Sequence, residues 1–223
     1  MRQKKHKLLF CLLTCTFFIS SAQEPIVKPS GKNEAGILLI GVRQNYGLAF
    51  SSDFYVAFFN GIDYKRHFGL NAIRLGMEYR NARDEGFGDF VGTSHYQENK
   101  FSIGYEHSFL KKSIRPFLGV DLIYLHSKFQ EEFNGGFWDA YFKQDLTENG
   151  FGFAPLLGIN FLLFRAFSLS FEADFEILNI NRKGTGIKNE IDDPAARHMY
   201  PIQNNEHINL LNPLRSMALN YIF

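Results

Sequence analysis

Cysteine is nearly absent from this chain of 223 residues, and its two cysteines, Cys11 and Cys15, both lie close to the N-terminus. We expect that N-terminal segment to be removed on export, for the reasons given next. The mature chain would then contain no thiol. This excludes disulfide bonds and thiol chemistry from its function.

Long hydrophobic runs are also missing after residue 20, where no stretch approaches the roughly 18 apolar residues of a transmembrane helix. The densest apolar run, residues 8–19, is shorter than that and is followed by the small residues 20–22. Four basic residues precede it: Arg2, Lys4, Lys5 and Lys7. This order predicts a signal peptide over residues 1–23. An uncleaved membrane anchor is the alternative.

The sequence has no large charge of either sign, with 24 basic and 23 acidic residues. Removing the four basic residues of the signal leaves 20 against 23, a formal charge of −3. Such a balance does not favour nucleic acid as a partner. The abundant residues are aromatic, with 25 Phe and 10 Tyr. An exported, Phe-rich chain without a spanning helix can still be a membrane protein if it forms a closed β-barrel.

Alternation with a period of two recurs along the chain and predicts strands. The clearest case places Ile73, Leu75 and Met77 on one face and Arg74 and Glu78 on the other. Eight such segments can be counted: 36–44, 54–64, 70–80, 100–109, 115–127, 151–161, 167–179 and 208–223. We therefore predict an all-β fold, an eight-stranded antiparallel up-and-down transmembrane β-barrel over residues 35–223, preceded by a periplasmic leader, 24–34.

The predicted connections alternate in length, as in a membrane barrel with short periplasmic turns and long external loops. The short ones are 65–69, 110–114 and 162–166, and the long ones are 45–53, 81–99, 128–150 and 180–207. Small residues crowd the polar face, aromatics crowd the strand ends, and lysines such as Lys65 fall in turns. These features favour an apolar face toward lipid. A soluble lipocalin-like barrel, with the faces reversed, is the alternative.

The last segment alternates with large apolar residues at Met217, Leu219, Tyr221 and Phe223. This pattern resembles the C-terminal signal that the outer-membrane assembly machinery reads. With the strand count and the alternating connections, it makes residues 35–223 similar to the OmpA/OmpX-like group and to the PorT-like outer membrane protein beta-barrel domain family. The resemblance implies location in the cell outer membrane and contact with outer-membrane lipid and the assembly machinery. It implies no catalytic residue.

The predicted inward face carries charges that a narrow lumen cannot leave unpaired. These are Arg43, Asp63, Arg74, Glu78, Arg80, Glu106, Asp121, Glu172, Asp174 and Glu176. We expect either a hydrogen-bonded plug or a carboxylate-lined ion path. Because the acids outnumber the arginines, some carboxyls must be protonated, hydrated or near the barrel mouth.

The predicted loop 128–150 is the main candidate for a surface that binds a glycan or a protein, through Phe133, Phe137, Trp138 and Tyr141. Packing of these aromatics on the barrel rim is the alternative. No His–Ser pair faces the same side of a predicted strand, and no metal-ligand spacing is found. We therefore expect no enzyme and no cofactor. We predict a structural or surface-interaction barrel, with a narrow pore or a secretion or assembly accessory barrel as the alternative, and a lipid-modifying enzyme as a third.

Overall fold

The structure is a computed structural model that describes residues 33–44, 54–87, 90–110, 113–135, 140–164, 166–189 and 197–223. The predicted signal peptide and most of the predicted leader fall outside these ranges. Among the described residues, no helix has the length and hydropathy to cross a bilayer.

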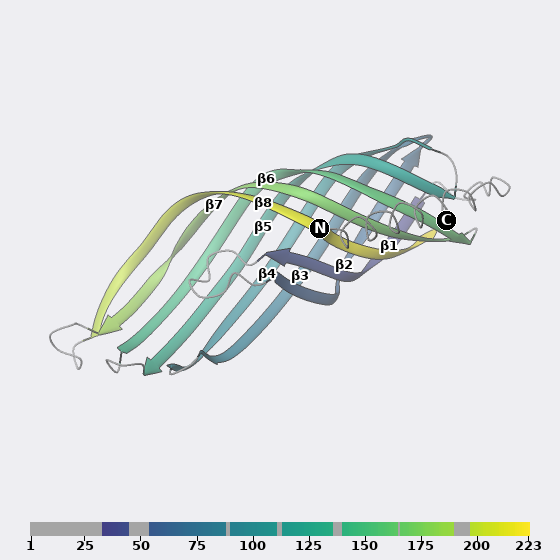
Figure 1. Ribbon diagram of the computed structural model, residues 1–223. Coiled ribbons are helices and arrows are strands. Elements are labelled where there is room, and N and C mark those ends of the chain that lie inside the picture. The colour runs from purple at the N-terminus through teal and green to yellow at the C-terminus, as the bar shows by residue number, and fades with distance from the viewer. Residues whose placement is uncertain are drawn as a thin grey trace, which may run out of the picture.

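Eight antiparallel strands close into a barrel in sequence order, each paired with its neighbours along the chain (Figure 1). They are β1 (Asn33–Gln44), β2 (Phe54–Phe68), β3 (Asn71–Phe87), β4 (Phe90–Ser108), β5 (Ile114–Gly135), β6 (Ala140–Phe164), β7 (Phe167–Asn189) and β8 (Arg197–Ile222). The ring closes between β1 and β8. There the Asn33 amide donates to the Phe223 carbonyl at 3.0 Å, and the Phe223 amide donates to the Asn33 carbonyl at 2.9 Å. The predicted fold class, an up-and-down barrel of this strand number, is confirmed.

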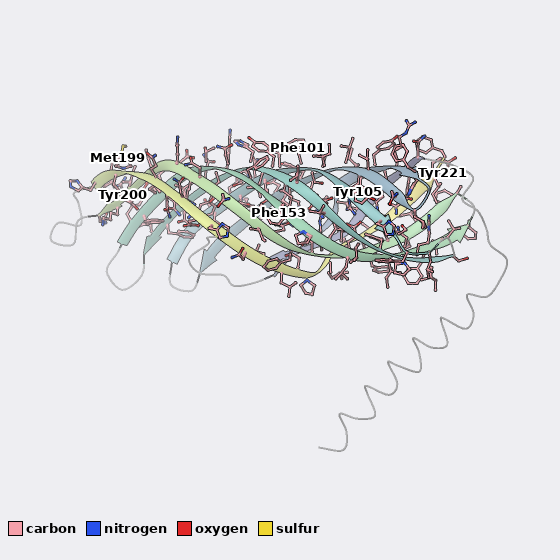
Figure 2. All side chains as sticks on the ribbon, turned by 90° about the horizontal axis from the view of Figure 1, so that it is seen from above. Phe101, Tyr105, Phe153, Met199, Tyr200 and Tyr221 are labelled. Atoms are coloured by element: carbon pink, nitrogen blue, oxygen red, sulfur yellow. The ribbon has the colours of Figure 1, made fainter. Side chains whose placement is uncertain are left out.

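The exterior is apolar and the interior is polar, the reverse of a water-soluble barrel. On β7, the outward Phe167, Phe175 and Ile177 alternate with the buried Ser168, Asp174 and Glu176. The outward apolar residues from Phe167 to Ile177 span about the 9–11 residues that cross a bilayer in a tilted strand. Aromatics mark both ends of the apolar belt. Figure 2 shows Phe101 and Phe153 on its exterior and Tyr221 at the end where the chain closes.

The strands are longer than the alternation predicts. Most of the predicted loops 81–99, 128–150 and 180–207 continue the sheet, with β8 as the longest strand at 26 residues. Among the described residues, β3 to β8 continue in this way, whereas β1, described to Gln44, and β2, described from Phe54, are shorter (Figure 1). We call the polar continuation of β3 to β8 beyond the apolar belt the projecting sheet. It comprises residues 81–87, 90–99, 126–135, 140–149, 179–189 and 197–209.

The rim of the barrel is stepped as a result. Pairing of β8 with β1 ends at Ser216, whereas pairing of β8 with β7 continues to Arg197. Pairing of β3 with β2 ends at Glu78, whereas pairing of β3 with β4 continues to Phe87. In the described part of the chain, the projecting sheet is therefore open between β3 and β8.

A bulge in β1 and β2 corrects one predicted face. Regular alternation over the predicted strand 36–44 would place Leu38 on the lipid face together with Ile40, but the Leu38 side chain is only 8% exposed and lies inside, while Ile37 faces out. The register shifts between Leu38 and Ile40, opposite Phe59, which has a positive φ of 52°. A bulge adds a residue to one strand and so reverses the alternation beyond it. The predicted parity therefore fails at Leu38, before the bulge, whereas Gly41, beyond the bulge, is buried as predicted.

Candidate functional site: the interior charge cluster and the projecting sheet

Charged side chains fill the middle of the lumen, and Arg74 on β3 is their centre. Its Nη2 lies 2.7 Å from Glu172 Oε2, its Nε 3.1 Å from Asp121 Oδ1, and its Nη1 3.3 Å from Glu106 Oε2. The three carboxylates come from β7, β5 and β4, so one guanidinium ties together strands on different sides of the ring. The planar fork of Arg suits such multiple pairing.

Arg215 on β8 is a second centre. Its Nη2 lies 2.9 Å from Glu78 Oε1, its Nη1 3.0 Å from Asp121 Oδ2, and its Nε 3.4 Å from Asp174 Oδ2. Strict alternation back from Phe223 would turn Arg215 toward lipid. Between the pairs Glu172↔Ser216 and Asp174↔Asn212, however, β8 has three residues where β7 has one. This bulge lets both Arg215 and Ser216 point inward.

Two lysines complete the network. Lys65 Nζ lies 2.9 Å from Glu106 Oε2 and 3.4 Å from Glu172 Oε1. Lys100 Nζ lies 3.0 Å from Glu78 Oε1 and 2.9 Å from Glu176 Oε1. Both lysines are almost fully buried. The prediction that placed Lys65 in a turn was wrong, because β2 continues through it to Phe68.

These contacts define the interior charge cluster: Lys65, Arg74, Glu78, Lys100, Glu106, Asp121, Glu172, Asp174, Glu176 and Arg215. Alternation had singled out Arg74, Glu78, Glu106, Asp121, Glu172, Asp174 and Glu176. The structure adds the three cations Lys65, Lys100 and Arg215. The cluster therefore holds six acids against four cations, a smaller excess of acid than the seven acids against three arginines of the predicted lumen set.

The other predicted lumen residues lie around the cluster. Arg80 is buried and its Nε is 3.7 Å from Glu98 Oε1, a buried acid that alternation had not included. Asp63 lies beside the interior Gly36, because a Cβ built on that glycine would meet its Oδ1. Arg43 belongs to β1, but its side chain lies outside the described part of the structure.

Small residues make room for the cluster. A Cβ added at Gly104 would overlap Asp121 Oδ1, and one at Gly158 would overlap the Phe117 ring. The Phe117 ring in turn lies beneath Lys65, with 4.9 Å from Nζ to the ring centroid. Gly104 and Gly158 therefore stand where a charged and an aromatic side chain of a neighbouring strand pack.

His67 and Ser168 contact the same carboxylate in the lumen. His67 Nε2 and the Ser168 hydroxyl both contact the Glu34 carboxylate, at 2.9 and 3.1 Å. The carboxylate thus lies between the serine and the imidazole, whereas a nucleophilic serine needs the imidazole as its direct partner. The described residues contain no cluster of three or more His, Cys, Asp or Glu arranged to hold a metal.

The predicted loop surface divides between strand and undescribed chain. Phe133 lies on β5 and Tyr141 on β6, so neither belongs to a loop, while Phe137 and Trp138 lie outside the described residues. Tyr141 lies under the Arg197 guanidinium at 4.1 Å and donates to Glu132 at 3.0 Å. Lys143 also bonds Glu132, at 2.8 Å. Hydrogen bonds from Lys143 and Tyr141 lower the pKa of the Glu132 carboxyl.

The predicted C-terminal signal residues lie on the outside of β8. Leu219, Tyr221 and Phe223 are exposed there, and Met217 is half-buried. Tyr221 stacks on Phe223 with ring centroids 5.9 Å apart and meets Phe167 at 5.3 Å. These rings form part of the aromatic rim at the closing end of the barrel.

Comparison with known proteins identifies no family for this chain. No protein-family model matches the chain, and no curated protein matches it. Among solved structures, the chain is similar to a major outer membrane protein from Thermus thermophilus. The identity is 13% and the TM-score 0.44, and the alignment covers 87% of this chain and 100% of that one.

Proposed function

We propose that this chain is an integral outer-membrane β-barrel with a sealed interior, which carries the projecting sheet as a surface-interaction platform. The observation that carries the proposal is the inverted barrel. Large apolar side chains such as Phe58, Phe151 and Leu157 are more than half exposed on the outside, while Lys65, Glu106 and Asp121 are fully buried within. Only a surrounding apolar phase stabilises such an exterior.

The buried charges also favour a sealed barrel over a narrow pore. A conducting lumen exposes its charged side chains to water. Here the residues of the cluster are at most 7% exposed, because each is covered by its partners and the barrel wall. The bonds between Arg74, Arg215 and carboxylates on different strands support the first alternative from the sequence, a rigid plug.

The projecting sheet supports an interaction role at the cell surface. A bilayer needs strands of only about 9–11 residues, yet β5 to β8 have 22, 25, 23 and 26 residues. Ordered structure beyond the membrane presents Tyr141, Glu132, Lys143 and Arg197 to solvent, and we assign recognition of surface glycans or proteins to this part. We also propose membership of the OmpA/OmpX-like or PorT-like group, no catalytic activity, and assembly by the outer-membrane machinery.

Planar bilayer recording tests the sealed interior. The purified chain, first shown to be folded by heat-modifiable gel migration, is added to the bilayer beside a porin of known conductance. We expect the porin to give steady current steps and this chain to give none. Steady conductance from the folded chain would establish the pore instead.

A further inference from the structure

A shallow hollow of about 370 Å³ lies on the outside of the barrel, across β5 to β8, where the apolar belt meets the projecting sheet. Its outward side chains form two adjacent rows, and in each row the residues lie side by side on successive strands. In the lower row, Tyr124 pairs with Phe151, Phe151 with Asn179, and Asn179 with His207. These residues face away from the lumen, so the hollow is separate from the interior charge cluster.

The upper row consists mainly of amides. Asn149 pairs with Asn181, and Asn181 with Asn205, on successive strands. The hollow thus combines two aromatic rings, Tyr124 and Phe151, with the side-chain amides of Asn149, Asn179, Asn181 and Asn205. One acid, Glu206, lies at its border, where it pairs with Arg182 at 3.1 Å. The outward lining therefore holds no Lys, Arg, Asp or Glu.

The amides are held in fixed orientations by neighbouring side chains. Asn149 Oδ1 accepts from His126 Nδ1 at 2.9 Å and from the Tyr124 hydroxyl at 3.2 Å. Asn179 Oδ1 accepts from His207 Nδ1 at 2.9 Å. Because both oxygens are occupied, the two Nδ2 groups remain as donors, and neither has a partner among the described residues.

We propose that this hollow binds the neutral sugar headgroup of an outer-leaflet glycolipid. Fixed amides bond hydroxyl groups, and exposed aromatic faces pack on the apolar face of a sugar ring. The outward lining lacks the Lys or Arg that phosphate headgroups usually pair with, which favours a sugar over a phosphate headgroup. The apolar belt begins directly below, at Phe153 and Ile177, so the acyl chains of the same lipid have a surface to follow. This inference rests on the proposed outer-membrane location.

Native mass spectrometry of the full chain in a zwitterionic detergent tests the proposal. The probes are digalactosyldiacylglycerol, phosphatidylglycerol and a free galactose disaccharide. We expect the galactolipid to bind at least tenfold more tightly than either of the other two. Equal binding of phosphatidylglycerol would mean general lipid adhesion, and equal binding of the free disaccharide would mean a soluble glycan. Either result overturns the proposal.

The double variant Asn149→Asp/Asn179→Asp keeps the acceptor oxygens that His126 and His207 use and removes the two donor groups. We expect galactolipid binding to weaken on the order of tenfold, as for the loss of two modest hydrogen bonds. Asn71→Asp is the matched control, because Asn71 Oδ1 also accepts from a tyrosine and a histidine, Tyr105 and His107, but lies at the start of β3, outside the hollow. Its binding should equal that of the parent. Unchanged binding in the double variant would contradict the proposal.

Heat-modifiable migration is recorded on the same samples. A chain that shifts on heating but binds no galactolipid would refute this inference alone. A chain that does not shift would refute the outer-membrane barrel itself.

Discussion

Arg215 shows how strongly one side chain can contribute to the stability of a closed lumen. Its guanidinium lies between Glu78, Asp121 and Asp174, which come from three other strands. Burying four charges is costly, and only their mutual pairing offsets that cost. We therefore expect this cation to contribute more to the free energy of unfolding than any single ion pair on the surface of the barrel.

Replacing Arg215 measures its contribution to the stability of the barrel. We expect Arg215→Met to lower the free energy of unfolding by about 3–5 kcal/mol, because three carboxylates lose their common partner in a buried site. Urea titration of the refolded protein in detergent micelles, followed by gel migration, measures this. The control on the same strand is Arg197→Met, which removes an exposed cation over Tyr141 and should cost under about 1 kcal/mol. Equal effects would show that the interior pairing adds nothing.

Gly104 is the second residue whose replacement has a defined outcome. A methyl group there would overlap Asp121 Oδ1 and lie 2.5 Å from the Val120 carbonyl oxygen. We expect Gly104→Ala to destabilise the barrel by about 1–3 kcal/mol in the same titration. Gly150→Ala, where the nearest atoms are 3.3 Å away, serves as the control and should change stability less. A larger loss of stability for Gly150→Ala than for Gly104→Ala would mean that Asp121 can move aside at little cost.

Single-residue misses in the sequence prediction have simple causes. Lys65 has the same parity as Asp63 and would have been assigned to the lumen if the predicted strand had continued one residue further. Arg215 could not be assigned by parity, because a bulge intervenes. Two signals did point to it: Pro213, since proline within a strand marks a bulge or an edge, and an arginine placed on a lipid face, which is costly.

Among the strands, the bulge of β8 has the clearest single effect, because it turns Arg215 inward. Removing Pro213 and Leu214 would leave Arg215 alone opposite Ala173, and regular alternation would then turn it toward lipid. We expect this deletion to lower stability by about 2–4 kcal/mol from the exposed charge alone. Arg215→Leu should stabilise the deleted chain while destabilising the parent. Urea titration of the four chains measures this reversal of sign, and the same sign in both backgrounds would contradict the role given to the bulge.

The lengths of the strands were the least predictable part of the elements. Within the apolar belt, one face is apolar and the other polar, so Ile73–Met77 and Phe167–Ile177 alternate clearly. In the projecting sheet both faces are polar or mixed, as at Gln97–Asn99 on β4, and alternation gives no signal. Pairing with neighbouring strands, rather than local pattern, extends the sheet there.

For the barrel as one body, the lack of cysteine outside residues 11 and 15 allows the orientation to be mapped with single introduced thiols. We expect Lys128→Cys, on the projecting sheet, to react with a membrane-impermeant maleimide on intact cells. Leu157→Cys, in the apolar belt, should stay unlabelled. Arg66→Cys, exposed near the turn after β2, should react only after the cells are permeabilised. Labelling of the last on intact cells would invert the proposed orientation.

The architecture could be predicted from sequence because it rests on repeated, redundant signals: strand count, alternation and the aromatic ends of the belt. The outer hollow could not, because Tyr124, Asn149, Phe151 and Asn179 come from three strands. Their meeting depends on register, and one residue of slip would place different side chains together. The register is fixed by the pairing of all the strands in the ring, so the sequence of a single segment does not predict it.

The stepped rim has a geometric consequence. A barrel of even height looks the same from every direction within the membrane plane. Among the described residues, β1 and β2 form a low side here and β5 to β8 a tall one (Figure 1). The molecule is therefore asymmetric about the membrane normal. A neighbouring protein in the bilayer meets a different height of the rim on each side of the barrel. For a plain cylinder, rotation about the membrane normal changes nothing. For this barrel, the rotation decides which neighbouring molecules the projecting sheet can contact.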